Sequence, residues 1–333
     1  MGLKGSTVGR VVFGRRPEDP GRGHHLLGAS DDVGDDDRAA IAAHSGVSGP
    51  ILGAQTVQTA LATYPLPSDR RAIALFRVDG EDERGRTLEV TTYVLEPEQY
   101  ESLGCNPFQL SRILGPADGR EPPRGRLPPL SLPADPDGPP WSVAAVLRRW
   151  HPRAIAAVYA HWRRGEGVGI LSATPFPATL EALGLLLGRV GRRASALHTF
   201  LTSSARGWSI AQSPSRRQLE AAGLEVVVPE SSADVSDPVA RSLGELAHAL
   251  DPARTASLEE LLDVYDVDLR EQHPHLPRLL SQSARGAALD ALELDDARAL
   301  ADLSGTEAAR RALLRAAEGI LGADAARPPS EAT

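Results

Sequence analysis

The chain has 333 residues, and 41% of them are hydrophobic, enough to bury a core in one large domain or two ordinary ones. Its formal net charge of -8 argues against a general nucleic-acid or anionic-membrane surface, because both need a concentrated positive field. Cys105 is the only cysteine, which excludes an intrachain disulfide and a cysteine-based zinc cluster. With no apolar leader in MGLKGSTVGRVVF and no membrane span, we expect a cytoplasmic globular protein.

The first 114 residues are expected to form an α+β unit. Residues 7–13 predict its first strand, and the acidic residues 30–37 suit the start of a helix over residues 38–44. Two further strands, residues 71–78 and 86–95, are joined by the turn-like DGEDERG and predict a β-hairpin. The remaining elements of this unit are helices expected over residues 55–64, 96–103 and 108–114.

Residues 115–140 are rich in proline and glycine and mark the clearest break in the chain. Such residues can neither pair in a central sheet nor continue a helix. We therefore expect a linker or a long surface loop, followed by a second unit over residues 141–235.

The second unit is expected to be an α/β core in which helices and strands alternate. Its centre is a helix from Leu180 to Val190, apolar almost all round and ended by Gly191, then a strand over residues 196–202. Residues 208–212 predict a strand that returns beside it. Pro152 should kink or restart the preceding helix. A further strand over residues 168–171, a helix over 214–223 capped by Ser213, and a strand over 224–228 complete the pattern, which favours a partly parallel sheet with packed helices.

Residues 236–321 are expected to be helical, and residues 322–333 a disordered tail. Asp237 and Pro238 form a helix start ahead of an apolar stripe. The later helices are expected over residues 277–284, 295–303 and 306–321. The fold class is therefore mixed α+β and α/β, with a helical C-terminal region.

Several polar residues invite a chemical interpretation, and each has a structural alternative. His24 and His25 lie near an acidic run that could hold a divalent cation, but a solvated helix start needs the same composition. That run consists of Asp31, Asp32, Asp35, Asp36 and Asp37. His198 in the core strand is more often a hydrogen-bonded buried histidine than a catalyst. His273 and His275 lie in an expected loop without a pattern of carboxylate ligands.

The motifs of common enzymes are absent from the sequence. It contains no GxSxG elbow, HExxH helix or GxGxxG turn. We therefore assign no catalytic residue, no metal ligand and no cofactor, a reading that leans against an enzyme.

Two stretches resemble the GTPase-associated proteins encoded in bacterial conflict, or defence, gene clusters. Residues 11–30, VVFGRRPEDPGRGHHLLGAS, are similar to the opening strand, glycine loop and HxLLxxS-type segment of that family. Residues 192–203, with an arginine pair and LHTFLTS, are similar to its Arg-Arg segment and following strand. The chain departs from the family at His198, where a small or aromatic residue is expected, and in a longer loop at residues 17–22. The resemblance covers about the first two thirds of the chain.

This resemblance implies a non-catalytic adaptor that works beside a GTPase partner, and it carries over no catalytic residue. Two alternatives remain open. One is a divalent-metal-dependent hydrolase that uses His24, His25 and the run from Asp31 to Asp37. The other is a nucleotide-binding or small-molecule-binding α/β domain, with its ligand at the C-terminal ends of the strands over residues 168–171 and 196–202.

Overall fold

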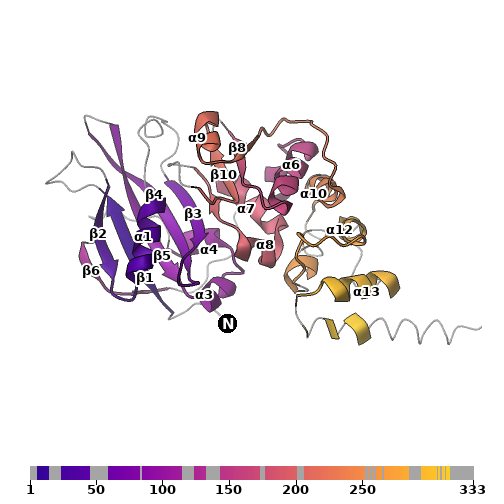
Figure 1. The fold of residues 1–333 in the computed structure, drawn as a ribbon, viewed down its shortest axis with the longest axis horizontal. Coiled ribbons are helices and arrows are strands. Elements are labelled where there is room, and N and C mark those ends of the chain that lie inside the picture. Colours follow the sequence, from indigo (N-terminus) through magenta and orange to yellow (C-terminus); the bar gives the residue numbers. More distant parts are fainter. Residues whose placement is uncertain are drawn as a thin grey trace, which may run out of the picture.

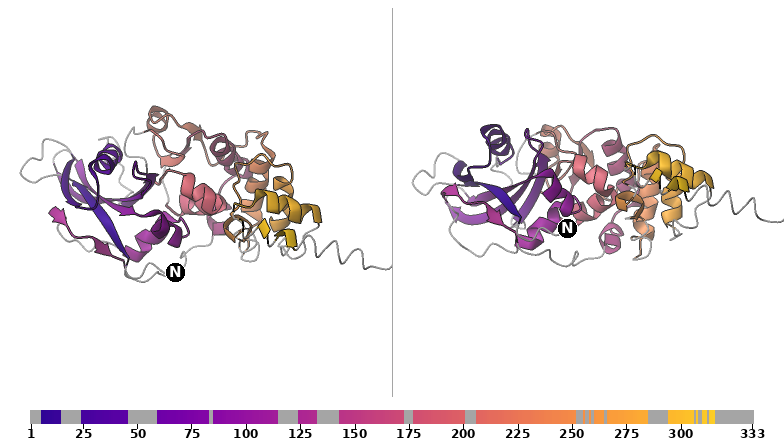
Figure 2. Two further views of the ribbon diagram at one scale, coloured as in Figure 1. Left: turned by 60° about the horizontal axis from the view of Figure 1, so that its bottom comes forward. Right: turned by 90° about the horizontal axis from the view of Figure 1, so that it is seen from below.

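The computed structural model of the chain shows one mixed sheet of eleven strands, with helices on both faces (Figure 1). The N-terminal strands lie at one end of the molecule and helices α12 and α13 at the other, in all three views of Figures 1 and 2. The structure describes residues 6–14, 24–45, 59–82, 85–114, 124–132, 143–172, 177–200, 206–251, 255, 258, 260–264, 266–284, 294–305, 307, 310–311 and 313–315.

The N-terminal half of the sheet is antiparallel. Its strands are β1 (Thr7–Gly14), β2 (His25–Ser30), β3 (Thr59–Pro65), β4 (Arg71–Asp82) and β5 (Gly85–Leu95), in the spatial order β3-β4-β5-β1-β2. Strands β4 and β5 pair antiparallel, which confirms the predicted hairpin.

The prediction of a helix over residues 55–64 is wrong for residues 59–64, the part that the structure describes, because these residues belong to strand β3. Ala60, Ala62 and Tyr64 point to one face of the sheet, while Leu61 and Thr63 point to the other, and all five are buried. A strand buried on both faces has no polar alternation, so this segment cannot be distinguished from a buried helix by periodicity.

Three helices of the N-terminal part confirm the predictions closely. They are α1 (Asp35–His44), α3 (Pro97–Ser102) and α4 (Pro107–Leu114). Helix α1 begins after Gly34 without a side-chain cap, and three aspartates occupy its first turn, where negative charge favours the helix dipole.

Part of the expected linker belongs to the sheet. Strand β6 (Gly125–Leu127) pairs parallel with β2, and β7 (Leu130–Ser131) pairs antiparallel with β1. Leu127 and Leu132 are buried. The two prolines between these strands lie at the edge of the sheet, where a missing N–H group costs no ladder bond. Residues 115–123 and 133–140 lie outside the described residues, and the proposed division into units stays a prediction.

The second half of the sheet is parallel. Strand β10 (Ile210–Ser213) lies between β8 (Val168–Leu171) and β9 (Leu197–His198) and runs parallel to both, and β11 (Glu225–Val227) runs parallel to β8. The partly parallel sheet is therefore confirmed, but the expectation that β10 returns antiparallel to β9 is wrong. Strand β9 also pairs antiparallel with β3, so the two halves form one continuous sheet.

The helices between these strands follow the predicted order, but the long apolar helix differs from the prediction. Helix α5 (Val143–Leu147) ends before Pro152, which starts α6 (Pro152–Arg163) as expected. The long apolar helix is interrupted at Gly188 and not ended by Gly191. It forms α7 (Pro177–Leu186) and α8 (Gly188–Ala194), because Gly188 has a φ of 67° and a Cβ there would lie 2.8 Å from Leu262.

The C-terminal region is helical, as predicted. Asp237 accepts hydrogen bonds from the N–H groups of Val239 and Ala240 and caps α10 (Pro238–Ala249). The π-helix η1 (Glu260–Val264) follows, then α12 (Leu276–Ala284) and α13 (Leu294–Leu303). Helix α9 (Arg216–Ala221), before β11, is capped by Ser215 and not by Ser213. Residues 322–333 lie outside the described residues, and residues 306–321 are described only in part.

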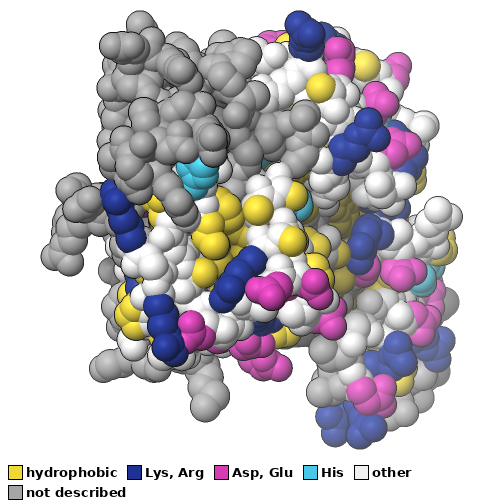
Figure 3. Space-filling view, turned by 60° about the vertical axis from the view of Figure 1, so that its left-hand side comes forward, with side chains coloured by type: hydrophobic (Ala, Val, Ile, Leu, Met, Phe, Trp, Pro, Cys, Tyr) yellow, Lys and Arg dark blue, Asp and Glu magenta, His cyan; other side chains and the backbone are white. Residues whose placement is uncertain are grey.

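The sheet divides the core into two layers. We call the face that carries Ile73 and Leu197 the α6 face, because it packs with α6 and most other helices in the larger apolar cluster. The opposite α1 face, which carries Tyr64 and Phe76, packs with residues of α1 and α9. On the surface shown in Figure 3, Lys and Arg side chains are interspersed with Asp and Glu. Among the described residues, no helix is long and apolar enough to cross a membrane.

Candidate functional site

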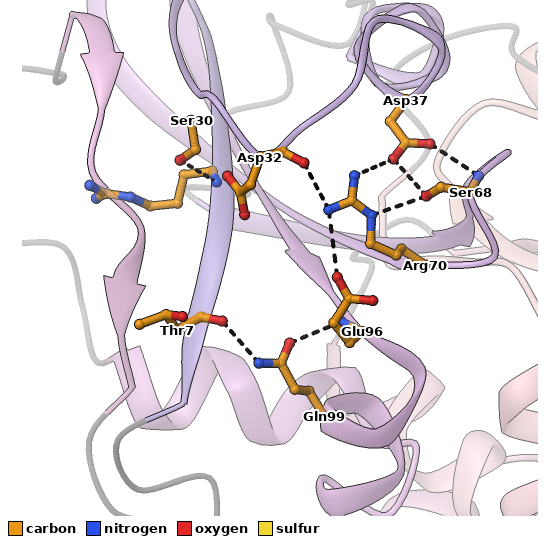
Figure 4. Close-up of polar contacts among 9 residues, drawn as sticks. Thr7, Ser30, Asp32, Asp37, Ser68, Arg70, Glu96 and Gln99 are labelled. Atoms are coloured by element: carbon orange, nitrogen blue, oxygen red, sulfur yellow. Dashed lines mark hydrogen bonds and ion pairs between the residues drawn. The ribbon is translucent and has the colours of Figure 1, made fainter.

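The acidic run before and within α1 is tied to the sheet by Arg70 (Figure 4). The Arg70 guanidinium pairs with the Asp37 carboxylate at 2.7 Å and donates to the Asp32 carbonyl oxygen at 3.1 Å. Ser68 donates to Asp37 from its hydroxyl at 2.7 Å and from its backbone N–H at 3.2 Å. Glu96 approaches Arg70 at 3.7 Å. This network holds α1 against the turn between β3 and β4.

The protonation of Asp37 reflects this network. Burial alone would raise the pKa of Asp37, but hydrogen bonds from Ser68 and Arg70 outweigh it, and the pKa is lowered. Of the other aspartates, Asp31 pairs with Arg126 of β6, and Asp35 pairs with Arg38 at 3.5 Å. At least three carboxylates of the run therefore have arginine partners.

The histidines proposed as metal ligands are not gathered with these carboxylates. His24 and His25 are half-buried at the start of β2. The His273 and His275 rings lie 5.7 Å apart before α12, and His275 approaches Asp296 at 4.0 Å. Within the described ranges, no three His, Cys, Asp or Glu residues form a group that could hold a metal ion.

The arginine pair of the family-like segment joins three parts of the chain. Arg192 is buried and pairs with Asp263 of η1 at 2.9 Å, and it donates to the Gly104 carbonyl oxygen at 3.0 Å. Arg193 pairs with Glu101 of α3 at 3.1 Å. Sequence analysis did not find these ion pairs, because their partners are distant in the chain.

Arg71 on the α6 face is a second buried cation that the sequence did not reveal. Its guanidinium donates to Thr63 Oγ1 at 2.8 Å, to the Arg193 carbonyl oxygen at 3.1 Å and to the Ser195 carbonyl oxygen. The Tyr100 ring lies 5.1 Å from its central carbon. Burial lowers the pKa of Arg71, while Tyr100 and Cys105 oppose that change. The two carbonyl groups lie at the C-terminal end of α8, where the helix dipole favours a cation.

The α1 face carries a different group of polar side chains, which we call the aromatic cluster: His44, Tyr64, Phe76, His198 and Trp208. The His44 ring stacks on Tyr64 with centroids 4.1 Å apart, and Trp208 meets Tyr64 edge-on at 5.8 Å. The His198 ring lies 4.8 Å from Trp208 and 5.0 Å from Phe76. Strands β3, β4 and β9, the segment before β10 and helix α1 supply one member each.

His198 is buried, as the sequence indicated, but it is not fully hydrogen-bonded. The Phe200 N–H donates to His198 Nδ1 at 3.3 Å, whereas Nε2 has no hydrogen-bond partner. Burial, with a smaller contribution from His44, lowers the pKa of His198 to about 3, so the ring is neutral near pH 7. The expectation of a satisfied core histidine is therefore only half correct.

Trp208 leaves a second buried donor without a partner. The Trp208 residue is only 2% exposed, and its Nε1–H group has no hydrogen-bond partner. Trp162 is a contrasting case on the α6 face, because its Nε1–H donates to Ser195 Oγ at 2.8 Å. Burial raises the pKa of Tyr64, and the nearby Thr92 hydroxyl opposes the rise, although neither oxygen has a partner at good hydrogen-bond geometry.

An open pocket of about 770 Å³ lies between the starts of α6 and α10. Arg153 pairs there with Asp234 at 3.0 Å and donates to the Ser232 carbonyl oxygen at 2.9 Å. Arg241 and Glu245, one turn apart on α10, have exposed side chains without a hydrogen bond or ion pair in the described part of the chain. The lining residues are His151, Pro152, Arg153, Ala156, Asp234, Val235, Ser236, Arg241 and Glu245.

The fold is that of a mixed α/β protein, with a buried aromatic cluster on the α1 face and an open pocket between α6 and α10. We compared the chain with models of protein families and with curated proteins, and neither comparison gave a match.

Proposed function

We propose that the chain is a non-catalytic adaptor that docks a protein partner at the pocket between α6 and α10. The observation that carries this proposal is the pocket itself, with its volume of about 770 Å³ and two exposed side chains of opposite charge, Arg241 and Glu245, in its lining. The resemblance to GTPase-associated proteins of bacterial conflict systems makes a GTPase the expected partner.

The chemistry of the pocket suits a protein segment. Arg241 and Glu245 are one helical turn apart, so an acidic and a basic side chain on a partner can pair with both. Val235 and Ala156 add an apolar part to the lining, as at the centre of many protein interfaces. Such a surface favours one orientation of the partner, because reversing it would place like charges together.

The carboxylates considered as metal ligands make internal contacts that indicate a structural role. Asp37 is occupied by Ser68 and Arg70, and Asp31 is paired with Arg126. A metal-dependent hydrolase would need such carboxylates as ligands, and their release from arginine would weaken the attachment of α1.

The proposal is tested by affinity capture from the native host, followed by calorimetry with the purified partner. We expect a GTPase to be recovered and its affinity to fall about tenfold or more in Arg241→Glu, through a like-charge contact. The double variant Arg241→Glu with Glu245→Arg should bind no better, because both partner charges are then mismatched. Arg217→Glu, at an exposed position of α9, is the matched control and should bind the partner with unchanged affinity.

Two results would contradict the proposal. The first is a GTPase that binds with unchanged affinity to Arg241→Glu, since docking would then lie elsewhere. The second is stoichiometric zinc or manganese with hydrolytic turnover that is lost when His24 and Asp32 are both changed to Ala, which would favour the enzyme.

A further inference from the structure

We propose that the partner segment bound in the pocket between α6 and α10 is an extended chain that pairs, as a strand does, with residues 232–236. These residues belong to the connection from β11 to α10, residues 229–237, which we call the strap. The segment carries an acidic and a basic residue on either side of one apolar residue. This inference rests on the proposed docking of a protein at the pocket, and it names the conformation and the side chains of the docked segment.

The strap runs beside α6 from one end of the helix to the other (Figure 1). At its start, the Pro229 carbonyl oxygen accepts from the His151 N–H at 3.0 Å, and at its end Asp237 pairs with Arg163, the last residue of α6, at 2.8 Å. Helix α6 has 12 residues and is about 18 Å long, because each residue rises about 1.5 Å. Eight residue steps cover this length, so the strap is drawn out and not helical.

The strap offers a row of free backbone groups along the pocket. Residues 230–237 contain no proline, so each has an N–H donor as well as a carbonyl acceptor. In the part of the chain that the structure describes, the backbone groups of residues 233–236 have no hydrogen-bond partner, and Ser232 uses only its carbonyl oxygen, towards Arg153. Such a row is a template to which an extended peptide can add as a strand.

An extended occupant fits this wall of the pocket better than a helix does. The backbone groups of a helix are bonded within the helix, so a docked helix leaves the donors and acceptors of the strap without partners. An extended segment turns the N–H and carbonyl groups of alternate residues to one edge, where they can pair with the strap. The main chain of the segment then supplies affinity, and its side chains supply specificity.

The other walls of the pocket determine which side chains suit it. Side chains two positions apart in an extended chain point to the same side and lie about 6.7 Å apart. Arg241 and Glu245 are exposed and lie about 6 Å apart along α10, because four residues rise about 1.5 Å each. An acidic and a basic residue two positions apart can therefore pair with both. The residue between them points to the opposite side, into the pocket, where Pro152 and the buried Ala156 offer an apolar contact.

The charge balance of the lining also favours a segment with both charges. Arg153 and Asp234 pair with each other at 3.0 Å and are therefore already neutralised. The lining as a whole contains two arginines and two carboxylates. A purely acidic or purely basic segment would place like charges together at Glu245 or at Arg241, which opposes binding.

The test uses the full chain and two capped pentapeptides, Ser-Glu-Val-Lys-Ser and Ser-Lys-Val-Glu-Ser. The two orders place their charges alike only when they bind in opposite directions, so a strap that pairs in one direction prefers one order. We expect the preferred peptide to bind with a dissociation constant below about 1 mM, measured by calorimetry. Peptides with two Glu or two Lys residues at these positions should bind about tenfold more weakly.

Hydrogen exchange shows whether the strap pairs with the peptide backbone. The preferred peptide should slow the exchange of the N–H groups of residues 232–236 about tenfold or more, since bonded N–H groups exchange more slowly than free ones. N-methylation of the peptide at the central Val or at the residue after it, but not at both, should weaken binding about tenfold. Neighbouring N–H groups of an extended chain point to opposite edges, so only one of the two can face the strap.

A charge exchange on α10 tests the side-chain pattern without changing the strap. The double variant Arg241→Glu with Glu245→Arg should reverse the preference between the two peptides, because it exchanges the charges while the direction of backbone pairing stays the same. Both residues are exposed, so the variant should keep the fold. Arg217→Glu, at an exposed position of α9, is the control and should keep the wild-type preference.

Three results would overturn the inference. The first is that neither peptide binds with a dissociation constant below about 1 mM. The second is binding that leaves the exchange of residues 232–236 unchanged, which would show docking through side chains alone, as by a helix. The third is a preference that the double variant does not reverse. In each case the proposed function still stands if the affinity of the GTPase falls in Arg241→Glu, so the two failures are distinguishable.

Discussion

Two buried donor side chains on one face of the sheet are hydrogen-bonded, whereas two on the other face have an N–H group without an acceptor. On the α6 face, Arg71 donates to three oxygen atoms, and Trp162 donates to Ser195. On the α1 face, His198 and Trp208 each keep a buried N–H without an acceptor. The bonded donors of Arg71 and Trp162 stabilise the architecture, whereas the unpaired donors of His198 and Trp208 contribute no hydrogen bond to stability.

Of the substitutions that test this comparison, the removal of Arg71 should lower the free energy of unfolding most. Arg71→Met keeps much of the side-chain volume but leaves the Arg193 and Ser195 carbonyl oxygens and the Thr63 hydroxyl without their donor. We expect a loss of about 3 kcal/mol or more in the free energy of unfolding, measured by urea denaturation. Arg149→Met, at an exposed position, is the control and should change stability little. A loss below about 1 kcal/mol would mean that the network on the α6 face adds little stability.

Acid should weaken the chain through His198. The folded-state pKa of about 3 lies below the ordinary value of 6.5, so the unfolded chain binds a proton first as the pH falls. Stability from the neutral ring is complete above about pH 6.5, and it falls by up to about 1.4 kcal/mol per pH unit until the folded ring titrates near pH 3. His198→Phe should remove this contribution to the slope of the free energy of unfolding against pH, between about pH 6 and 4. The carboxylates should contribute equally to that slope in the wild-type and variant chains. An unchanged slope would show that His198 is protonated in the fold.

The Asp37 network should have a smaller effect. Asp37→Asn removes the charge that pairs with Arg70 but keeps the shape, and we expect a loss of about 1 to 2 kcal/mol at pH 7. The lowered pKa of Asp37 means that its contribution is present above the ordinary carboxyl pKa and is lost as the pH falls through the folded value. Wild type and variant should therefore converge in stability in acid. Asp36→Asn, one residue earlier in α1, is the exposed control.

Much of the fold could be predicted from local patterns. The hairpin of β4 and β5, the restart at Pro152 and the Asp237 cap depend on residues close in the chain. Strand β3 and the direction of β10 could not be predicted, since burial on both faces removes the polar alternation and a parallel connection has no local signature.

The candidate sites were less accessible to prediction. The aromatic cluster joins residues from four strand-associated segments and a helix, and the sequence identified only His198 among them as a buried polar residue. Whether a buried histidine or tryptophan has a partner depends on tertiary distances. The same holds for Arg71, whose two backbone carbonyl acceptors lie more than a hundred residues later in the chain.

The most direct test compares Trp162→Phe with Trp208→Phe by urea denaturation at pH 7. Both substitutions remove similar volume from a buried indole, so the difference between them isolates the hydrogen bond. We predict that Trp162→Phe loses about 1 to 2 kcal/mol more than Trp208→Phe, because only Trp162 gives up a bonded donor. Equal losses, or a larger loss for Trp208→Phe, would contradict the distinction between the bonded Trp162 on the α6 face and the unpaired Trp208 on the α1 face.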